Sequence, residues 1–347
     1  MKKALALLLA FAVMLGCAAC GGRGESDKGQ NADANTPEVK KIGVVIYNFD
    51  DNFMTLYRKE LERYFESLGT DERCYEVTVM DGKNDQMAQN KAIEGFIAQG
   101  VDAIILNAVK TSSLEPIVER VVSAGIPLVL INREPLGDNG DESCRFILDN
   151  PLVCYVGADS RQSGTFQGEI IRDLPDRGDL NHDGKVSCIM LEGDPENPDA
   201  QYRTEYSVKA LRDAEIEVEL LDDRVGDWME EKGQYYTALA LARFGDRIEV
   251  VFSNNDAMAL GAYTSIVGAG RTVGSDIYLV GVDALDECVM MVRDGRMTGT
   301  VRNDYVNQSH KAANVAIAAI NGESIENYYW VDYVKITNDL GKQQGLE

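Results

Sequence analysis

The stretch IGVVIYNFDDNF (residues 42–53) decides the fold, because it joins a short apolar run to a polar turn and the start of a helical pattern. An apolar run of this length is consistent with a strand buried on both faces. Similar runs alternate with helical patterns from Ile42 onward. This alternation predicts parallel sheets with helices on both faces.

The alternation covers most of the chain. Strands are predicted at residues 42–47, 75–80, 102–106, 127–131, 154–157, 187–191, 216–221, 248–252, 277–282, 298–302 and 329–336. Helices are predicted between them, including residues 53–68, 85–99, 112–124, 161–174, 203–214, 229–243, 257–267 and 306–320. About 310 of the 347 residues follow the N-terminal segments, which is enough chain for two domains. We therefore expect an α/β protein with two doubly wound parallel-sheet domains.

The N-terminus has the pattern of a secretory signal. A positively charged start is followed by an apolar run at residues 4–16, which is too short to span a bilayer. A cysteine at the end of such a run is typical of bacterial lipoproteins; Cys20, with small residues on both sides, is the favoured lipidation site, and Cys17 is a rival. Residues 1–20 are thus a predicted signal segment and residues 21–39 a flexible tether. We expect an extracytoplasmic lipoprotein anchored to the cell membrane, with an unanchored secreted protein as the alternative.

Charge and residue counts exclude several classes of protein. The chain has 34 Lys and Arg against 57 Asp and Glu, a net charge of −23, which argues against nucleic acid and anionic lipid as partners. The cysteines after Cys20 have no CxxC spacing, so buried thiols are favoured over a disulfide framework or a zinc site. A Cys144–Cys154 disulfide is the alternative. The chain has 2 histidines, which argues against a histidine-based triad or metal catalyst.

Polar or aromatic clusters follow the predicted strands at seven places. The clusters begin at Tyr47, Asn107, Asn132, Glu192, Ser253, Val282 and Arg302. In doubly wound sheets, ligands bind beyond the carboxyl ends of the strands. Capping of the next helix can explain any single cluster, but it does not explain why the polar residues are so often doubled and flanked by aromatic ones. The clusters therefore predict a binding site.

The residue types in these clusters suit a sugar. Asn donates and accepts, Asp accepts and Arg donates in a planar fork, so together they match hydroxyl groups that donate and accept at once. An aromatic ring suits the apolar face of a pyranose, and Phe53 and Trp228 are the candidates. A place for Trp228 in the hydrophobic core is the alternative.

The stretch DLNHDGKVS (residues 179–187) resembles half of a calcium site. Oxygen-bearing side chains stand at alternate positions, and Gly184 follows them at the tight turn. A complete twelve-residue calcium loop would end on Glu, but its twelfth position is Met190. Calcium here requires a carboxylate from elsewhere in the fold, and a solvated acidic turn is the alternative.

Seven motifs carry a resemblance to a known family. They are Ile46-Tyr-x-x-Asp-Asp51-Asn-Phe53-Met, Asn132-x-Glu-Pro, Asp179-Leu-Asn-x-Asp-Gly, Gly193-x-Pro-x-x-Pro-Asp199-Ala-x-x-Arg203, Glu249-Val-Val-x-x-Asn-Asn255-Asp-Ala-Met, Gly281-Val-Asp283-Ala-Leu and Gly299-Thr-Val-x-Asn303-Asp. With these motifs the chain resembles, from about Lys41 to the C-terminus, the periplasmic galactose/glucose-binding proteins. These are a branch of the type I solute-binding proteins of ABC importers.

The resemblance implies two domains joined by three crossovers, near residues 157–159, 302–304 and 334–337, with a sugar between the domains. The N-terminal domain would comprise residues 40–157 and 304–334, and the C-terminal domain residues 158–303 and 335–347. The implied sugar-binding residues are Asp51, Phe53 and Asn132 from the first domain, and Asn197, Asp199, Arg203, Trp228, Asn255, Asp283 and Asn303 from the second domain and the hinge. Phe53 and Trp228 would sandwich the ring, and Asn255 and Asp283 would bond to the sugar rather than cap helices.

The resemblance also implies a structural calcium ion. The family has a nine-residue loop whose last ligand is a distant Glu, and Glu249 occupies that place. The implied ligands are the side chains of Asp179, Asn181, Asp183, Ser187 and Glu249 and the carbonyl of Lys185. Two departures matter. Asn197 replaces the usual His, which leaves glucose versus galactose open, and Ser187 replaces a longer amide, which lowers the expected calcium affinity.

We therefore expect a monomeric, lipid-anchored receptor without enzymatic activity. It would close on one hexose, D-galactose or D-glucose, and deliver that sugar to an ABC permease. A sugar-sensing input protein for a membrane receptor or kinase would have the same pocket, and a glycosidase using two pocket carboxylates is a remote alternative. A transcription regulator of the same fold is excluded by the signal segment and by the absence of a basic DNA-binding headpiece.

Overall fold

The computed structural model describes residues 37–135, 144 and 150–338, and the compact unit begins at Pro37. The predicted signal segment, Cys17, Cys20 and most of the predicted tether lie outside the described residues. The end of the tether at residue 39 is wrong, because Glu38 and Val39 already pair with the neighbouring strand. Both residues are exposed, so the apolar pattern that marked a start at Ile42 did not extend to them.

The first sheet has six strands in the order β11-β5-β4-β3-β1-β2, and all neighbours are parallel. They are β1 (Glu38–Ile46), β2 (Arg73–Asp81), β3 (Ala103–Leu106), β4 (Leu128–Ile131), β5 (Val153–Gly157) and β11 (Tyr328–Trp330). The order reverses at β1, which lies between β2 and β3. Such a switch point opens a crevice at the carboxyl ends of the strands.

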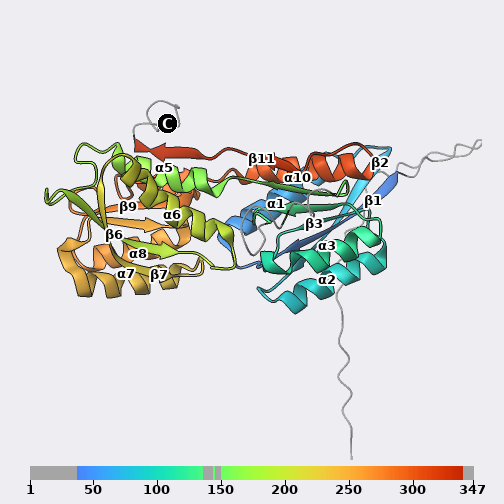
Figure 1. The fold of residues 1–347 in the computed structure, drawn as a ribbon. Coiled ribbons are helices and arrows are strands. Elements are labelled where there is room, and N and C mark those ends of the chain that lie inside the picture. Colours follow the sequence, from blue (N-terminus) through green and yellow to red (C-terminus); the bar gives the residue numbers. More distant parts are fainter. Residues whose placement is uncertain (1–36, 136–143, 145–149, 339–347) are drawn as a thin grey trace, which may run out of the picture. The chain divides into compact units, whose positions relative to one another are not determined.

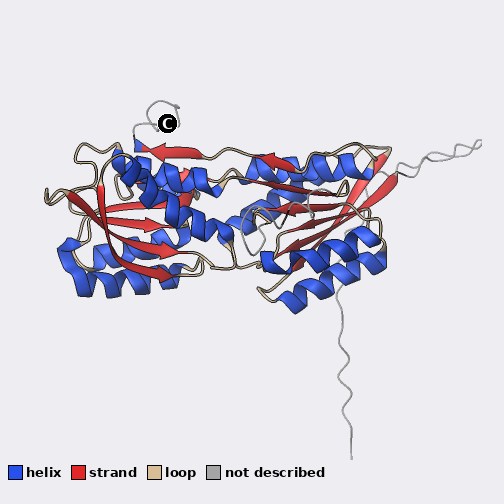
Figure 2. Ribbon diagram, in the orientation of Figure 1, coloured by secondary structure: helices blue, strands red, loops and turns tan. Residues whose placement is uncertain are grey.

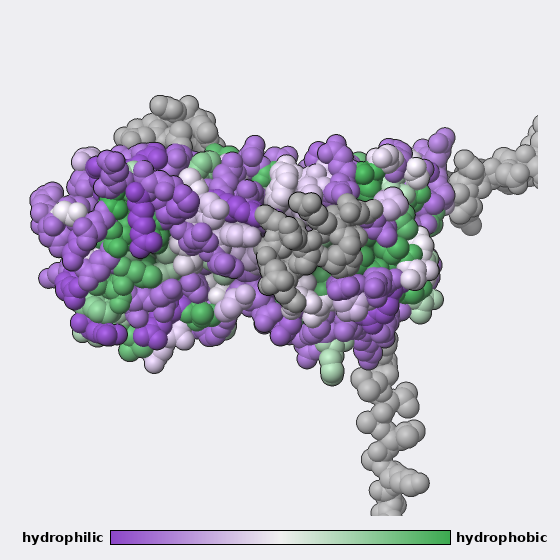
Figure 3. All heavy atoms as spheres, viewed as in Figure 1, coloured by the Kyte–Doolittle hydropathy of each residue, from purple (hydrophilic) through white to green (hydrophobic). Residues whose placement is uncertain are grey.

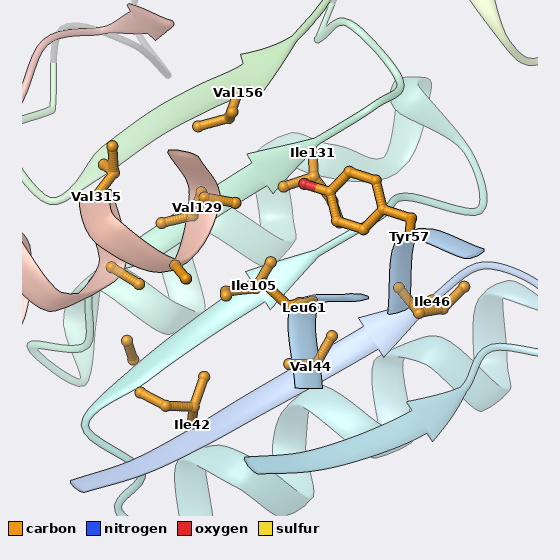
Figure 4. Packing of buried hydrophobic residues seen from close by; sticks show 14 of the residues in the cluster. Ile42, Val44, Ile46, Tyr57, Leu61, Ile105, Val129, Ile131, Val156 and Val315 are labelled. Carbon is orange, nitrogen blue, oxygen red and sulfur yellow. The ribbon is translucent and has the colours of Figure 1, made fainter. Parts of the chain in front are cut away.

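Helices cover both faces of the first sheet (Figure 1). They are α1 (Asn52–Ser67), α2 (Gln86–Gln99), α3 (Leu114–Ser123) and α10 (Tyr305–Ile320), with the short helix η1 (Thr111–Ser113) before α3. Strand residues such as Val44 and Ile105 point toward α1 and α10 (Figure 4), whereas Val45 and Ile104 pack on the face of α2 and α3. The period of two along each strand therefore divides the apolar side chains between two cores.

The second sheet has the order β12-β10-β9-β8-β6-β7, with β12 antiparallel to β10 and the other neighbours parallel. Its strands are β6 (Lys185–Glu192), β7 (Glu217–Val225), β8 (Val250–Ser253), β9 (Tyr278–Asp283), β10 (Gly299–Arg302) and β12 (Val334–Thr337). Its helices are α5 (Ser160–Arg172), α6 (Pro198–Asp213), α7 (Glu230–Phe244), α8 (Asp256–Gly268) and α9 (Asp286–Arg293), with η2 (Gly245–Arg247) after α7. Figure 2 shows strands layered between helices, and β6 marks the second switch point.

The predicted fold class, two doubly wound parallel sheets, is confirmed. The chain passes between the sheets after β5, after β10 and between β11 and β12. The division into two domains with boundaries at residues 157, 303 and 334 stays a prediction, and residues 339–347 of the second predicted domain lie outside the described residues.

Two predicted elements need correction, and one helix was not predicted. The single strand at residues 329–336 is two strands, β11 and β12, which belong to different sheets. No glycine or proline interrupts residues 329–336, so the sequence pattern gave no sign of the break. Helix α6 begins at Pro198 rather than at residue 203, because Asn197 caps it. Helix α9, of 8 residues, was not predicted.

The described residues include no helix long and apolar enough to cross a membrane. Hydrophilic residues predominate on the face seen in Figure 3, with hydrophobic residues gathered in smaller patches. Cys154 is a buried free thiol, so the alternative disulfide with Cys144 is not formed.

Candidate ligand-binding site

A cavity lies where the carboxyl ends of strands from both sheets converge. It is lined by Tyr47, Asp51, Phe53, Met54, Asn132, Arg133, Asn197, Asp199, Arg203, Trp228, Asn255, Asp283 and Asn303. A small ligand with several hydroxyl groups suits this mostly polar lining.

All of the predicted sugar-binding residues line this one cavity. The structure adds Met54, together with Tyr47 and Arg133 from the predicted strand-end clusters, none of which was predicted to bind the sugar itself. Contact of each residue with a ligand stays a prediction.

Helix capping and cavity lining are combined in the same side chains. Asp51 caps α1, Asn197 caps α6 and Asn255 caps α8, each by accepting a hydrogen bond from a main-chain N–H of the first turn. The expectation that Asn255 caps no helix is therefore wrong, because α8 begins directly after this strand end. Asp283 is not a helix cap, since α9 begins after Leu285.

We call the part of the cavity that follows the strands of the first sheet the first-sheet side. There the Asp51 carboxylate uses both oxygens within the protein. Oδ1 accepts from the Met54 N–H at 2.7 Å, and Oδ2 accepts from the Tyr47 hydroxyl at 2.7 Å. Phe53 packs edge-on against Tyr305, with ring centroids 6.5 Å apart. The Asp51 and Phe53 side chains are therefore held in place by contacts within the protein.

Asn132 is fixed in the same way. Its φ of 63° is in the left-handed region, and its carbonyl accepts a hydrogen bond from the Tyr155 hydroxyl at 2.7 Å. Its Oδ1 accepts from Nδ2 of the buried Asn107 at 3.1 Å. One lone pair of Oδ1 is thus used within the protein, and Nδ2 of Asn132 can donate to a ligand.

The part of the cavity that follows the strands of the second sheet, the second-sheet side, contains a buried ion pair. Asp199 and Arg203 lie one turn apart on α6, and Arg203 Nη2 is 3.3 Å from Asp199 Oδ2. Nη1 donates to the Asn254 carbonyl at 2.8 Å and Nη2 to the Tyr333 hydroxyl at 3.1 Å. Burial raises the pKa of Asp199, although Arg203 opposes this shift.

Two atoms of this ion pair have no hydrogen-bond partner, Asp199 Oδ1 and Arg203 Nε. A buried polar atom left without a partner costs about 1–3 kcal/mol. Both residues line the cavity, so one oxygen acceptor and one N–H donor remain unused beside it.

Trp228 lies in the turn after β7 with a φ of 66°. A side chain on Gly193 would meet its ring, because an added Cβ would lie 2.0 Å from the nearest ring atom. The Trp228 carbonyl accepts from Asn255 Nδ2 at 3.1 Å. Glycine at position 193 and this hydrogen bond together place the indole at the cavity.

Asp283 ends β9 and is 8% exposed. Asn303 Nδ2 is 3.5 Å from its Oδ1, a long hydrogen bond, while Asn303 Oδ1 accepts from Gln308 at 2.6 Å. Burial raises the pKa of Asp283 well above its usual range, and Arg203 opposes the shift. The carboxyl group of Asp283 is thus poorly satisfied by the protein.

Contacts between the two sides lie beside the cavity. The Arg133 guanidinium stacks on the Tyr47 ring, 3.9 Å from its centroid, and Nη2 lies 3.1 Å from Asp194 Oδ2. Nearby, Lys110 Nζ is 3.9 Å from the Glu196 carboxylate. Asp194 and Glu196 belong to the segment that carries Asn197, and elsewhere Arg161 Nη1 of α5 lies 3.2 Å from Glu134 Oε2, so several polar contacts tie the second-sheet side to the first.

The predicted calcium loop and its distant Glu lie together. Both Glu249 carboxylate oxygens accept main-chain hydrogen bonds from the loop, from Asn181 at 3.0 Å and Ser187 at 2.8 Å. The atoms predicted to coordinate the metal are oxygens, which calcium prefers. Within residues 37–135, 144 and 150–338, however, no group of three or more His, Cys, Asp or Glu side chains converges as a metal site. Calcium at Asp179, Asn181, Asp183, Lys185, Ser187 and Glu249 stays a prediction.

Sequence reasoning missed the residues that act through others. Asn107 was marked as a polar strand end, and that signal could have included it. Tyr47 and Arg133 stand beside predicted residues, but only the tertiary structure stacks one on the other. Tyr333 reaches Arg203 from the segment between β11 and β12, which was predicted as strand.

Comparisons with known proteins agree with this geometry. A family model described as periplasmic binding protein domain matches residues 42–324. The D-galactose/methyl-galactoside binding periplasmic protein MglB of Haemophilus influenzae is 32% identical over 93% of this chain and 90% of that protein. A putative rhizopine-binding protein of Rhizobium meliloti is 30% identical over 88% and 93%.

A solved structure adds a further relative. An ABC transporter solute binding protein from Bacillus halodurans C-125, with bound myo-inositol, is 28% identical and covers 90% of this chain and 98% of that one, with a TM-score of 0.75. The chain therefore belongs to the periplasmic binding protein domain family. Its homology to MglB confirms the resemblance to galactose-binding proteins.

Proposed function

We propose that this protein is an extracytoplasmic receptor that binds one hexose, D-galactose or D-glucose, and delivers it to an ABC permease. The observation that carries the proposal is the polar cavity lined from both sheets, beside which Asp199 Oδ1 and Arg203 Nε are buried without hydrogen-bond partners. The relation to MglB supports a hexose in particular.

Binding would proceed by closure of the two sides on the sugar. Asn132 Nδ2 would donate from the first-sheet side, and Asp199, Arg203 and Asp283 would bond to hydroxyl groups from the second. Phe53 and Trp228 would cover the faces of the ring. The Arg133–Asp194 ion pair would form as the sides meet, so closure and ligand burial would occur together.

Selectivity would arise from unpaired groups. An inverted or missing hydroxyl leaves a buried carboxylate or amide without a partner, at a cost of roughly 1–3 kcal/mol. Asn197 already accepts from the Asp199 N–H at 3.1 Å, so only its Nδ2 would reach a ligand oxygen. A His at this position would reach further, and Asn197→His tests its part in the choice between the two hexoses.

Calorimetric titration of residues 21–347 with D-galactose, D-glucose, D-ribose and myo-inositol tests the ligand class. We expect micromolar or tighter binding of one hexose and at least tenfold weaker binding of the other two compounds. Preference for myo-inositol would contradict the hexose proposal. It would indicate the same ligand as the one bound in the structure from Bacillus halodurans.

A lipid anchor at Cys20 and a structural calcium ion are part of the same proposal. Labelling with a palmitate analogue should be lost in Cys20→Ala and retained in Cys17→Ala.

A calcium chelator should lower the melting temperature, and Glu249→Gln should abolish the chelator effect. Retained labelling in Cys20→Ala, or a melting temperature insensitive to chelator, would contradict the respective part.

We propose that the protein is not an enzyme. Its relatives named above are binding proteins. Release of the chromophore from a nitrophenyl galactoside or glucoside at a rate above buffer would contradict this, provided that Asp283→Asn abolishes the release.

A further inference from the structure

We propose that Asp256, which does not line the cavity, positions the ligand-binding carboxylate of Asp283 by holding the main-chain turn that follows it. The inference rests on the proposed function, since it assigns a positioning residue for the same sugar site. It concerns a side chain that is 0% exposed and that lies directly after the cavity residue Asn255.

The turn that carries Asp283 has an unusual conformation. Asp283 and Ala284 have φ values of 118° and 53°, so two successive residues that are not glycine lie in the left-handed region. Left-handed conformations are unfavourable for L-residues and persist where surrounding structure enforces them. Ala284 has no polar side chain with which to stabilise the turn locally.

Asp256 and Thr300 hold this turn in its left-handed conformation through hydrogen bonds. The Leu285 N–H donates to Asp256 Oδ2 at 2.9 Å, and the Ala284 N–H donates to Thr300 Oγ1 at 3.3 Å. The Thr300 hydroxyl in turn donates to Asp256 Oδ1 at 2.7 Å. Both main-chain N–H groups that follow Asp283 therefore end on one linked pair of side chains.

The surroundings leave the Asp256 carboxylate little freedom. An added Cβ on Gly281 would lie 2.2 Å from Asp256 Oδ1, so glycine is required where β9 passes this oxygen. Asp256 belongs to the start of α8 and Thr300 to β10, and β9 lies between β8 and β10. The pair thus holds the end of β9 from two sides, from strand β10 and from the start of the helix that follows β8.

Asp283 depends on this support because its own side chain has little. Its carboxylate receives the 3.5 Å hydrogen bond from Asn303. By contrast, Asp51 on the first-sheet side has two hydrogen bonds of 2.7 Å on its carboxylate. The direction in which Asp283 points is therefore set chiefly by the main chain beneath it.

The test uses Asp256→Asn and Thr300→Val, with Thr237→Val as matched control. Thr237 is also fully buried, and its hydroxyl has no partner. Each variant of residues 21–347 is titrated with whichever of D-galactose, D-glucose, D-ribose and myo-inositol the wild type binds most tightly. We expect affinity to fall at least tenfold in the first two variants and less than twofold in the control.

A double-mutant cycle separates positioning from general damage. If Asp256 acts through Asp283, adding Asp256→Asn to Asp283→Asn should change the dissociation constant by less than twofold. Additive losses would overturn the proposal, because they would show that Asp256 affects binding by another route. Thr300→Val combined with Asp283→Asn gives the same test if Asp256→Asn does not fold.

Failure of the proposed function is distinguishable from failure of this inference. If the wild type binds none of the four compounds, the hexose proposal fails, and the turn is tested by hydrogen exchange in peptides that span residues 281–288. Exchange should be faster in Asp256→Asn and Thr300→Val than in the wild type and in Thr237→Val. Unchanged exchange in both variants would overturn the positioning role.

Discussion

The two sides of the cavity differ in how far the protein satisfies their polar groups. On the first-sheet side, both oxygens of Asp51 and the Oδ1 of Asn132 accept hydrogen bonds from protein donors. On the second-sheet side, Asp199 Oδ1 and Arg203 Nε have none, and burial raises the pKa of both Asp199 and Asp283.

We infer from this difference that the two sides have different tasks in ligand binding. The first-sheet side is arranged before a ligand arrives, so it contributes geometry at little cost. The second-sheet side keeps buried charge and unused hydrogen-bonding capacity, which lower stability until a ligand satisfies them. Most of the binding energy, and most of the stabilisation by ligand, should therefore come from the second-sheet side.

Removing the cation of the second-sheet side should have the largest effect. Arg203→Met leaves the Asp199 carboxylate buried without its partner, and we expect the free energy of unfolding to fall by about 3–5 kcal/mol. Chemical denaturation of the ligand-free protein measures this. The double variant Arg203→Met with Asp199→Leu should recover stability but not binding; wild-type stability in Arg203→Met alone would contradict the comparison.

The stability of the folded protein should decrease with rising pH because Asp256, next to the second-sheet side, is a buried acid. Burial raises the pKa of Asp256 from an ordinary 3.8 to about 7, so the folded state binds this proton more tightly than the unfolded state. The contribution of Asp256 to the free energy of unfolding is therefore greatest below about pH 4. It falls by roughly 2–4 kcal/mol as the pH rises to 7.

Denaturation curves from pH 4 to 8, compared between the wild type and Asp256→Asn, measure this contribution. Asp283 and Cys288 also face Asp256, and the difference between the two proteins removes their shared contribution. Parallel pH profiles would contradict the prediction.

Neutralising Asp283 should separate stability from binding. Asp283→Asn replaces a buried acid whose ionisation is disfavoured by burial with a neutral amide, so the ligand-free protein should melt at a higher temperature at pH 7. Hexose affinity should fall roughly 10–100-fold, because a sugar hydroxyl loses its acceptor. Asp286→Asn, an exposed acid in α9, is the matched control and should alter neither quantity. A lower melting temperature in Asp283→Asn would show that its burial costs nothing.

The corresponding change on the first-sheet side should have the smallest effect. Asn caps helices as well as Asp does, so Asp51→Asn should alter the unfolding free energy by less than about 1 kcal/mol. Affinity should fall less than tenfold, because the Asp51 oxygens are already engaged. Asp85→Asn, a cap of α2 outside the cavity lining, controls for capping. A loss as large as that of Asp283→Asn would remove the distinction between the sides.

Much of the site could be predicted because binding residues of parallel sheets stand at strand ends. Asp51, Asn132, Asn255 and Asp283 each follow or end an apolar run, and parallel strands bring such ends to one edge. The capping roles were harder to judge, since one side chain can cap a helix and line the cavity at once, as Asn255 does.

The sequence by itself determined the two sheets and the edge at which the cavity forms, because strand and helix periods and polar strand ends are local patterns. Tertiary structure alone decided how β11 and β12 divide between the sheets, which partner Arg133 finds, and how Asp256 supports the turn after Asp283. These features depend on contacts between segments far apart in the chain, and on a main-chain conformation that no local pattern specifies. For that reason the residues that line the cavity could be predicted from the sequence, whereas the residues that hold them in place could not.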